Sequence, residues 1–300
     1  MRVVVIGATG HIGSYLVPRL VSARHEVLVL SRGERSAYHD DPAWKVVERV
    51  EVDRVAEDAA GTFASRVASY GADAVVDLIC FTRSSAAQLA EALRGRPTLL
   101  LHCGTIWVHG PAVEVPATED LARRPLEEYG REKAAIEELL LGETAAGRLR
   151  AILLHPGHIV GPGWPPLNPA GHFDPAVFAT LAAGAELALP NLGLETVHHV
   201  HADDVAQAFE LALAAPAAVG EAFHVTSERA LTLRGYAEAV AAWFGNEALL
   251  AFLPWEEWRA SVSEEDAEAT WSHISHSQCM SIEKARRILG YEPGYTSLEA

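Results

Sequence analysis

A tyrosine and a lysine four positions apart, Tyr129 and Lys133, form the pattern in this 300-residue sequence with the clearest chemical use. In a helix both side chains would lie on one face, one turn apart. A phenol is a poor base at its usual pKa of about 10, but a neighbouring ammonium group favours the phenolate and lowers that pKa. Tyr129 could then take the proton of a substrate hydroxyl, with the Thr105 hydroxyl orienting the substrate oxygen. The pattern predicts acid–base chemistry at a hydroxyl-bearing carbon.

The first thirteen residues contain the glycines that would place a cofactor beside this pair. Residues Val3–Ile6 predict a buried parallel strand, and Ser14–Ala23 an amphipathic helix. Between them, Gly7 permits a tight turn, Gly10 lets the backbone approach a pyrophosphate, and Gly13 lets the helix lie against the strand. The helix amides would then face the phosphates. The context predicts a dinucleotide cofactor, whose oxidised nicotinamide would favour the phenolate and accept hydride; an ordinary glycine loop is the alternative.

The end of the second predicted strand bears on which dinucleotide binds. It carries Ser31 and Arg32, with Arg35 close behind, and no carboxylate for a ribose 2′-hydroxyl. An arginine there favours a 2′-phosphate, so we expect NADP in preference to NAD, although Arg32 could instead stack on the adenine of either. After the next strand, Asp53 precedes Arg54 and could accept a hydrogen bond from the adenine amino group or cap a helix.

Strands alternate with helices along the first half of the chain, which predicts an α/β fold with a doubly wound parallel sheet. Later, residues 223–226 predict a last sheet strand and residues 232–244 an amphipathic helix. We expect residues 1–160, with 195–226 returning to them, to form the cofactor-binding domain. Residues 161–194 and 227–300 would form a smaller, mostly helical substrate lobe.

The composition narrows the class of protein. Hydrophobic residues make up 49% of the chain, and no run of eighteen apolar residues predicts a membrane span. The net charge of −16 argues against a nucleic-acid surface. The chain begins with a strand predicted to lie in the core, so we do not expect a cleaved signal peptide at this end. The three cysteines, Cys80, Cys103 and Cys279, are few and odd in number, which argues against a disulfide framework. We therefore expect a cytoplasmic protein with reduced thiols.

The motifs together resemble the extended short-chain dehydrogenase/reductase superfamily, in its NAD-dependent epimerase/dehydratase family. Besides the glycine turn, Thr105 and the Tyr–Lys pair, three later segments are similar to the family: residues 155–163, 200–206 and 281–291. The resemblance implies a Rossmann-type NAD(P)-binding domain with a smaller C-terminal substrate lobe. It also implies a sugar or nucleotide-sugar as substrate, Lys133 on the nicotinamide ribose, and a homodimer. It supports an epimerase or a simple NADP-dependent reductase or dehydrogenase, which would use the same residues.

The sequence departs from that family at several positions. Ile106 and Trp107 follow Thr105, where the dehydratases carry an acidic pair, so we set dehydration aside. His155 and His158 stand in place of the usual Arg and Asn, and the region between the fourth and fifth strands lacks the family's relay Asn. A related subgroup includes chloroplast stem-loop RNA-binding proteins, which keeps a non-catalytic nucleotide- or RNA-binding protein open as an alternative.

Two further segments carry polar and aromatic residues. Residues 164–173 form an aperiodic loop that would lie over the strand ends, where Asn168, His172 and Phe173 either contact substrate or only pack. The histidines within residues 197–204 match no usual zinc spacing, so we predict a strand and no metal site. The candidate cofactor ligands are Gly7, Thr9, Gly10, His11, Ile12, Gly13, Ser31, Arg32, Arg35, Asp53, Arg54, Ile79, Tyr129, Lys133, His155, Pro156 and His158. The candidate substrate ligands are Phe81, Thr105, Trp107, His158, Asn168, His172 and Phe173.

Overall fold

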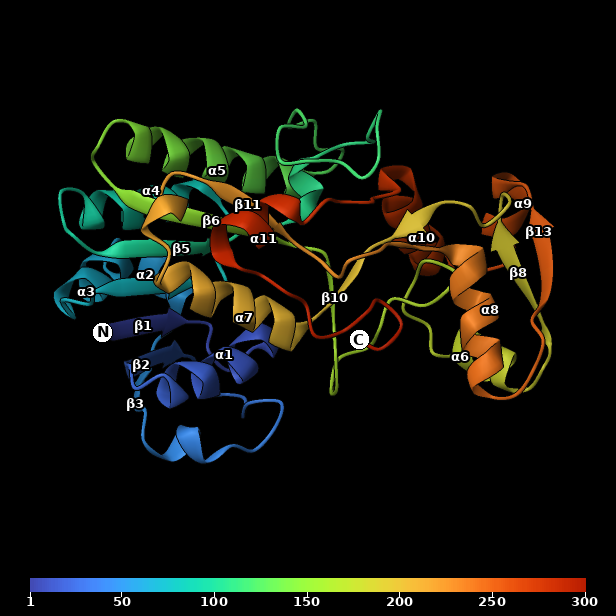
Figure 1. Cartoon of the computed structure of the whole chain (residues 1–300), viewed down its shortest axis with the longest axis horizontal. Coiled ribbons are helices and arrows are strands. Elements are labelled where there is room, and N and C mark those ends of the chain that lie inside the picture. Colours follow the sequence, from blue (N-terminus) through green and yellow to red (C-terminus); the bar gives the residue numbers. More distant parts are fainter.

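A seven-stranded, wholly parallel sheet forms the body of the computed structural model, which describes all 300 residues (Figure 1). The strand order is β11-β6-β5-β4-β1-β2-β3. Its central strands are apolar runs buried on both faces, as parallel strands between two helical layers must be. The predicted doubly wound α/β fold is confirmed. The strands are β1 (Arg2–Ile6), β2 (Glu26–Ser31), β3 (Glu48–Glu51), β4 (Ala74–Asp77), β5 (Leu99–Cys103), β6 (Arg150–Pro156) and β11 (Ala222–Val225).

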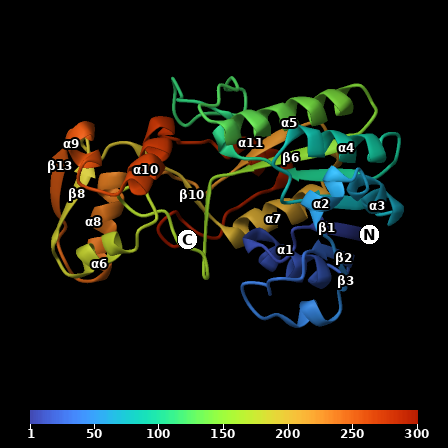
Figure 2. The same ribbon diagram turned by 180° about the vertical axis from the view of Figure 1, so that it is seen from behind.

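Helices cover both faces of this sheet, which Figures 1 and 2 show from opposite sides. One core contains the apolar faces of α1 (His11–Ser22), α7 (Ala202–Leu213) and α11 (Glu283–Leu289). The other contains those of α3 (Phe63–Ser69), α4 (Arg83–Leu93) and α5 (Glu128–Ala145). Short helices join the strands: α2 (Arg54–Ala59) and the 3₁₀ turns η1 (Pro42–Lys45), η2 (Ile106–Val108) and η3 (Pro216–Ala218).

A smaller lobe extends from the carboxyl ends of the strands and has its own core around the fully buried Trp258. The helix predicted over residues 232–244 is α8, and the Thr232 hydroxyl caps its first turn. The lobe and its connections comprise β7 (His158–Val160), α6 (Ala176–Ala182), β8 (Glu186–Pro190), β9 (Thr196–Val197), β10 (His199–His201), β12 (Leu231–Thr232), α8 (Leu233–Trp243), β13 (Leu249–Leu253), α9 (Trp255–Arg259) and α10 (Glu264–His276).

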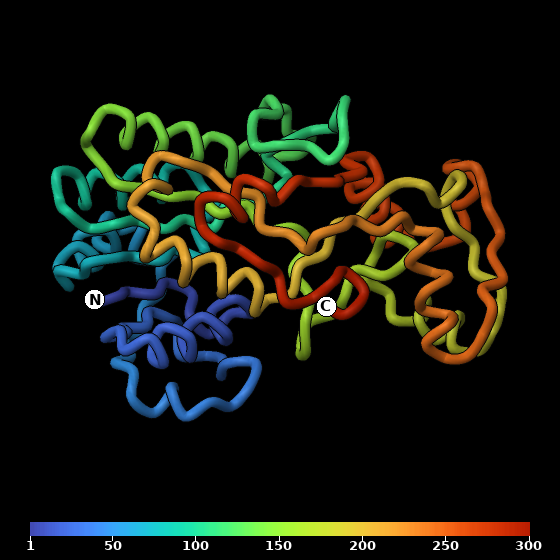
Figure 3. Tube along the Cα trace, in the orientation of Figure 1, coloured from blue at the N-terminus to red at the C-terminus, as the bar shows by residue number.

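The last residues return from the lobe to the sheet, as the red end of the tube in Figure 3 shows. Ala285 and Leu289 of α11, and Tyr291 beyond it, lie in the same core as α1 and α7. This differs from the predicted division, which grouped residues 227–300 with the lobe, because the apolar side of α11 covers β11. None of the helices is both long and apolar enough to cross a bilayer.

Candidate active site

Two joined cavities run along the carboxyl ends of the strands. One has a volume of about 480 Å³ and reaches from the glycine turn to Tyr129; the other, about 360 Å³, reaches from the same turn to the end of β2. Both are lined by Gly7, Gly10, Arg35 and Ile79, so they form one continuous cleft. This is the edge at which open α/β sheets bind their ligands.

The glycine turn has the geometry that a pyrophosphate requires. Gly7 has a φ of +83°, which L side chains rarely adopt. A Cβ on Gly13 would lie 2.1 Å from the carbonyl oxygen of Ala8, so only glycine lets α1 pack this closely against the turn. Gly10 caps α1 without a side-chain hydrogen bond, and the first turn carries no acid. The turn therefore offers free amides and the positive end of a helix dipole, and it fits a dinucleotide cofactor.

Thr105, Tyr129 and Lys133 all line the larger cavity. Lys133 is 2% exposed, and its ammonium group donates 2.7 Å hydrogen bonds to the carbonyl oxygens of Cys80 and Cys103. An ammonium group has three N–H donors, so one remains for a ligand. Its Nζ lies 5.8 Å from the centre of the Tyr129 ring. The helix register therefore brings the pair to one cleft, beside the hydroxyl of Thr105.

In the protein without cofactor, the pKa of Tyr129 lies above its ordinary value, whereas the lowered pKa predicted from the sequence included the effect of an oxidised nicotinamide. Burial raises the pKa of this phenol to about 12, and the nearby Thr105 side chain only partly opposes that rise. Lys133 does not reverse it, because burial also lowers the pKa of that ammonium group and two carbonyls hold it. In the protein alone, Tyr129 is thus a protonated phenol, although 42% of the residue as a whole is exposed. Such a group is better suited to donate a proton than to accept one.

The smaller cavity is lined by the residues predicted for the adenosine end, together with Thr9 of the glycine turn. Ser31 ends β2, while Arg32 is exposed and pairs with Glu34 at 3.1 Å. The Asp53 carboxylate caps α2 by accepting a hydrogen bond from the Ala56 amide. The capping alternative therefore holds for Asp53, which still borders the cavity.

Arg54 also borders the smaller cavity, but its guanidinium group is engaged within the protein. It is 7% exposed and donates to both carboxylate oxygens of Asp77, at 2.5 and 3.0 Å. It also contacts Asp58 at 3.3 Å and the hydroxyl of Ser85. This buried ion pair joins α2 to the end of β4, so Arg54 supports the floor of the cavity.

An aromatic group that the sequence analysis missed surrounds the start of α1. The His11 ring stacks on Trp164 with centres 5.7 Å apart and lies 5.0 Å from the Tyr38 ring. All three side chains line the larger cavity, as does Ile12. Tyr38 and Trp164 lie in irregular segments distant in sequence, where no periodicity marks them; their only signal is aromatic character in predicted loops.

The part of the cleft beyond the glycine turn has aromatic walls. Phe81, Trp107, His158 and Phe173 line it, as does Pro156. The Trp107 ring stacks on His276 of α10, with centres 4.6 Å apart and planes at 19°. Lys133 and Arg35 are the only Lys or Arg side chains that line this cavity, and no carboxylate lines it. A neutral, ring-shaped ligand suits these walls.

Three predicted site residues lie outside the cleft. His155 is fully buried, and its ring occupies the space that a Cβ on Gly104 would need. Asn168 is also fully buried, and its amide bonds the backbone of its own loop at Ala170 and Asp174. His172 pairs with Asp266 of α10 at 3.0 Å. The prediction that these three contact ligand is wrong for this structure, because each side chain turns into the protein.

The histidines near residue 200 make hydrogen bonds within the fold. The His198 ring bonds the carbonyl oxygen of Ser227 at 2.9 Å and accepts from the Met280 amide at 3.1 Å. The His201 ring accepts from the Asp203 amide and caps α7. These hydrogen bonds hold the connection between β9 and β10 and the start of α7. The strand predicted in this segment is present as β10.

Comparison with known proteins identifies the family. The NAD-dependent epimerase/dehydratase family matches residues 3–226. The chain is 33% identical over 268 residues to 2′-dehydrokanamycin reductase of Streptomyces kanamyceticus, across 89% of this chain and 73% of that protein. It is 29% identical over 268 residues to UDP-glucose 4-epimerase of Mycolicibacterium smegmatis, across 82% and 83% of the two chains.

Solved structures show the same fold. The complex of dTDP-glucose 4,6-dehydratase from Bacillus anthracis with NAD matches with a TM-score of 0.75, at 18% identity, over all of this chain and 93% of that one. The glycine turn, the sheet topology and the family match agree. The chain therefore belongs to the NAD-dependent epimerase/dehydratase family, within the extended short-chain dehydrogenases/reductases, and is an NAD(P)-dependent oxidoreductase or epimerase.

Proposed function

We propose that this enzyme reduces a ketone on a sugar ring to a secondary alcohol, with NADP as its cofactor. The observation that carries the proposal is that Thr105, Tyr129 and Lys133 share one cavity with the glycine turn. That cavity has room for a nicotinamide and one sugar ring, at about 480 Å³. Relatives that act on sugars, among them a reductase and an epimerase, support the same class of reaction.

Reduction of a ketone requires a hydride and a proton, and in this proposal a side chain of the protein donates the proton. When bound, the reduced nicotinamide supplies the hydride that reaches the carbonyl carbon. The Tyr129 phenol donates its proton to the carbonyl oxygen, and the Thr105 hydroxyl donates a hydrogen bond to the same oxygen. The remaining N–H of Lys133 holds the ribose of the cofactor. The phenolate then regains a proton from solvent, which the exposed edge of the ring reaches.

The walls of the substrate region favour a glycoside over a nucleotide-sugar. A diphosphate carries negative charge and is ordinarily held by Arg or Lys side chains or by helix N-termini. Lys133 and Arg35 are the only Lys or Arg side chains that line this cavity; two carbonyls already bind Lys133, and Arg35 also lines the smaller cavity. The flat faces of Trp107 and Phe173 instead suit the apolar face of a sugar ring. We propose a keto-glycoside without a diphosphate, in the manner of the 2′-dehydrokanamycin that a relative reduces.

The adenosine end favours NADP. Arg35 lines both cavities, and no Asp or Glu other than the capping Asp53 lines the smaller one. Since Arg32 already pairs with Glu34, we propose that Arg35 contributes most of the binding to the 2′-phosphate. Arg32 would add a weaker, solvent-screened attraction.

Steady-state kinetics with purified enzyme test the proposal. We expect NADPH oxidation with a keto-aminoglycoside, and no conversion of UDP-glucose or dTDP-sugars. Epimerisation of a nucleotide-sugar without added cofactor would support the second enzymatic function, because an epimerase keeps its cofactor through the cycle. If the enzyme bound NADP and NAD but converted neither keto-aminoglycosides nor nucleotide-sugars, the proposed catalytic role would be refuted. A nucleotide-binding protein would then be the remaining function.

A further inference from the structure

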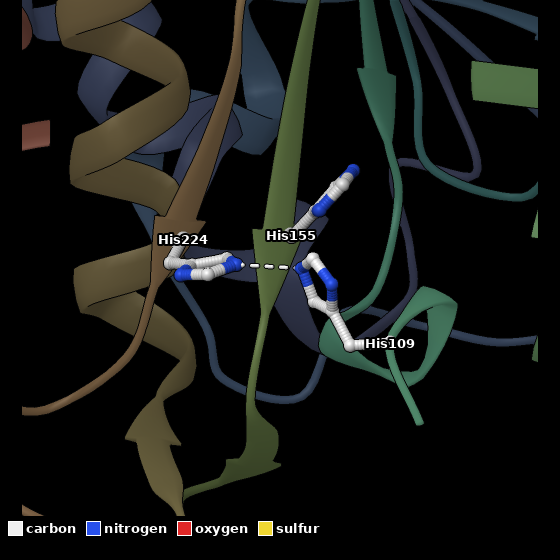
Figure 4. Close-up of side chains that lie close together, drawn as sticks. All are labelled: His109, His155 and His224. Carbon is white, nitrogen blue, oxygen red and sulfur yellow. Dashed lines mark hydrogen bonds between the residues drawn. The ribbon is translucent and has the colours of Figure 1, made fainter. Parts of the chain in front are cut away.

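Three histidines from distant parts of the sequence meet behind the active site. His109 follows η2, His155 lies on β6 and His224 on the neighbouring strand β11 (Figure 4). All three are completely buried. One ring nitrogen from each lies within 4.8 Å of the other two. Imidazole nitrogens gathered this closely are a ligand set that Zn²⁺ prefers.

Two ring nitrogens of this cluster lie near oxygen atoms of the kind found around bound zinc: the His224 nitrogen makes a hydrogen bond, and the His155 nitrogen approaches a carboxylate without forming one. Nδ1 of His224 lies 3.3 Å from the carbonyl oxygen of Ser281. Nε2 of His155 lies 3.5 Å from a carboxylate oxygen of Glu137. Histidines that bind metals ordinarily donate their second N–H to a carbonyl or carboxylate. These contacts leave Nε2 of His224 and Nδ1 of His155 for an inner ligand, next to Nε2 of His109.

Hydrogen bonds within the protein pair both nitrogens of His224 but leave His109 and His155 incompletely paired. Nε2 of His109 and Nε2 of His224 lie 2.9 Å apart, the contact drawn dashed in Figure 4. Neither nitrogen of His155 has a hydrogen-bond partner, and neither does Nδ1 of His109. An unpaired polar group in a dry interior costs about 1–3 kcal/mol. The His155 ring is therefore a fully buried group without a hydrogen-bond partner, and its centre lies 6.4 Å from that of His109 and 6.3 Å from that of His224.

The surroundings keep the rings in the form that binds a metal. Burial lowers the pKa of His109 to about 4 and holds those of His155 and His224 well below their usual value. Arg123 disfavours positive charge here, but it forms an ion pair with Glu137. Glu119, whose carboxylate accepts from the His224 amide at 2.9 Å, adds a second acid. Of the cations around the cluster, Arg123 is thus paired with Glu137 and Lys284 with Glu221, at 2.8 Å, while two carbonyl oxygens bind Lys133.

We propose that His109, His155 and His224 bind one Zn²⁺ ion as a structural site. Zinc nitrogens lie about 2.0–2.1 Å from the metal, so the His109–His224 pair opens slightly and His155 moves inward. A fourth position is left for one further ligand. The ion would tie β6 and β11 to the segment after η2, and the His155 ring also packs on Gly104, directly before Thr105. It would thereby fix the backbone that presents the Thr105 hydroxyl.

Metal analysis of the intact enzyme tests this site. After expression with zinc in the medium and extensive dialysis, inductively coupled plasma mass spectrometry should find about one Zn²⁺ per chain. X-ray absorption at the zinc edge should show nitrogen or oxygen ligands at about 2.0–2.1 Å and no sulfur. Removing the metal by refolding with a chelator should lower the melting temperature by at least about 5 °C, and Zn²⁺ should restore it.

Variants separate this site from surface binding. The variant His224→Gln should lose the ion, whereas His25→Gln, which removes a histidine of the solvent-facing turn before β2, should retain it. If His224→Gln does not fold, the wild-type metal content and absorption spectrum still decide the question. The proposal is overturned by wild-type enzyme without retained zinc, by sulfur in the absorption spectrum, or by a folded His224→Gln variant with undiminished zinc.

Discussion

Removing the Tyr129 hydroxyl is the most direct test of the proposed chemistry. In Tyr129→Phe the ring keeps its contact with Trp107, whose centre lies 6.2 Å away, so folding stability should change by no more than about 0.5 kcal/mol. The variant loses only the proton donor. Positioned general acids contribute about 10²–10⁴-fold to rate. We therefore expect kcat/KM for ketone reduction to fall by that factor, or about 3–5 kcal/mol of transition-state stabilisation.

The pH dependence of the wild-type enzyme adds a second measurement of the same group. A proton donor must be protonated, and burial raises the pKa of Tyr129 to about 12. The reductive kcat/KM should therefore remain level from neutral pH to about pH 10 and decline only above that, whereas an ordinary phenol would already titrate at about 10. In the oxidative direction the phenolate is the active form, so the rate should rise with pH over the same interval.

Both measurements follow the absorbance of NADPH during reduction of a ketone that the enzyme accepts. A thermal melt of each variant checks that it is folded. Tyr70→Phe is the matched control, because Tyr70 ends α3 and packs on the core away from the cleft. It should leave kcat/KM unchanged. If Tyr129→Phe kept more than about a tenth of wild-type kcat/KM at an unchanged melting temperature, the role given to the phenol would be wrong. A reductive profile that falls at about pH 8 would contradict the expected pKa.

Four further substitutions, one of them a control, test the cleft and its supports. Arg35→Ser should reduce the preference for NADP over NAD by about 10- to 100-fold, measured as the ratio of kcat/KM values, because it removes a charged donor to the 2′-phosphate. Gly13→Ala should destabilise the protein by about 1–3 kcal/mol and weaken cofactor binding in fluorescence titrations, since its Cβ would lie 2.1 Å from a carbonyl oxygen. Gly142→Ala, with nothing within 4 Å of its Cβ, should instead be stabilising by about 0.5–1 kcal/mol. Asp77→Asn leaves the buried Arg54 charge poorly paired and should cost about 3–5 kcal/mol, seen as a melting temperature about 6–10 °C lower; a drop below 2 °C would contradict the ion pair's role.

Features that depend on neighbouring residues could be predicted from the sequence. The apolar run before Gly7 and the glycine spacing predicted the strand, the turn and α1, and the four-residue interval put Tyr129 and Lys133 on one helix face. The direction of the Tyr129 pKa could not be predicted this way. It depends on how much of the protein surrounds the hydroxyl group and on which carbonyls hold Lys133, and neither follows from spacing.

Loop residues were predicted less well for a related reason. Asn168 lies in an aperiodic segment, where composition indicates a surface loop but not the direction of each side chain. Its amide turns inward because the loop backbone at Ala170 and Asp174 needs hydrogen-bond partners away from water. Phe173, five residues later, does line the cleft. Within one loop, Phe173 thus faces the cleft while Asn168 packs inside the protein, and the loop's composition does not distinguish them.

The sequence by itself determined the individual strands and helices, the glycine turn and the shared helix face of Tyr129 and Lys133, because each depends on contacts between residues close along the chain. Only the tertiary structure decided which distant side chains share a space. Folding brought Tyr38 and Trp164 to His11 in the lining of the cleft, and it brought His109, His155 and His224 together in the buried interior. Strand order and crossover paths set these distances, and no interval in the sequence encodes them.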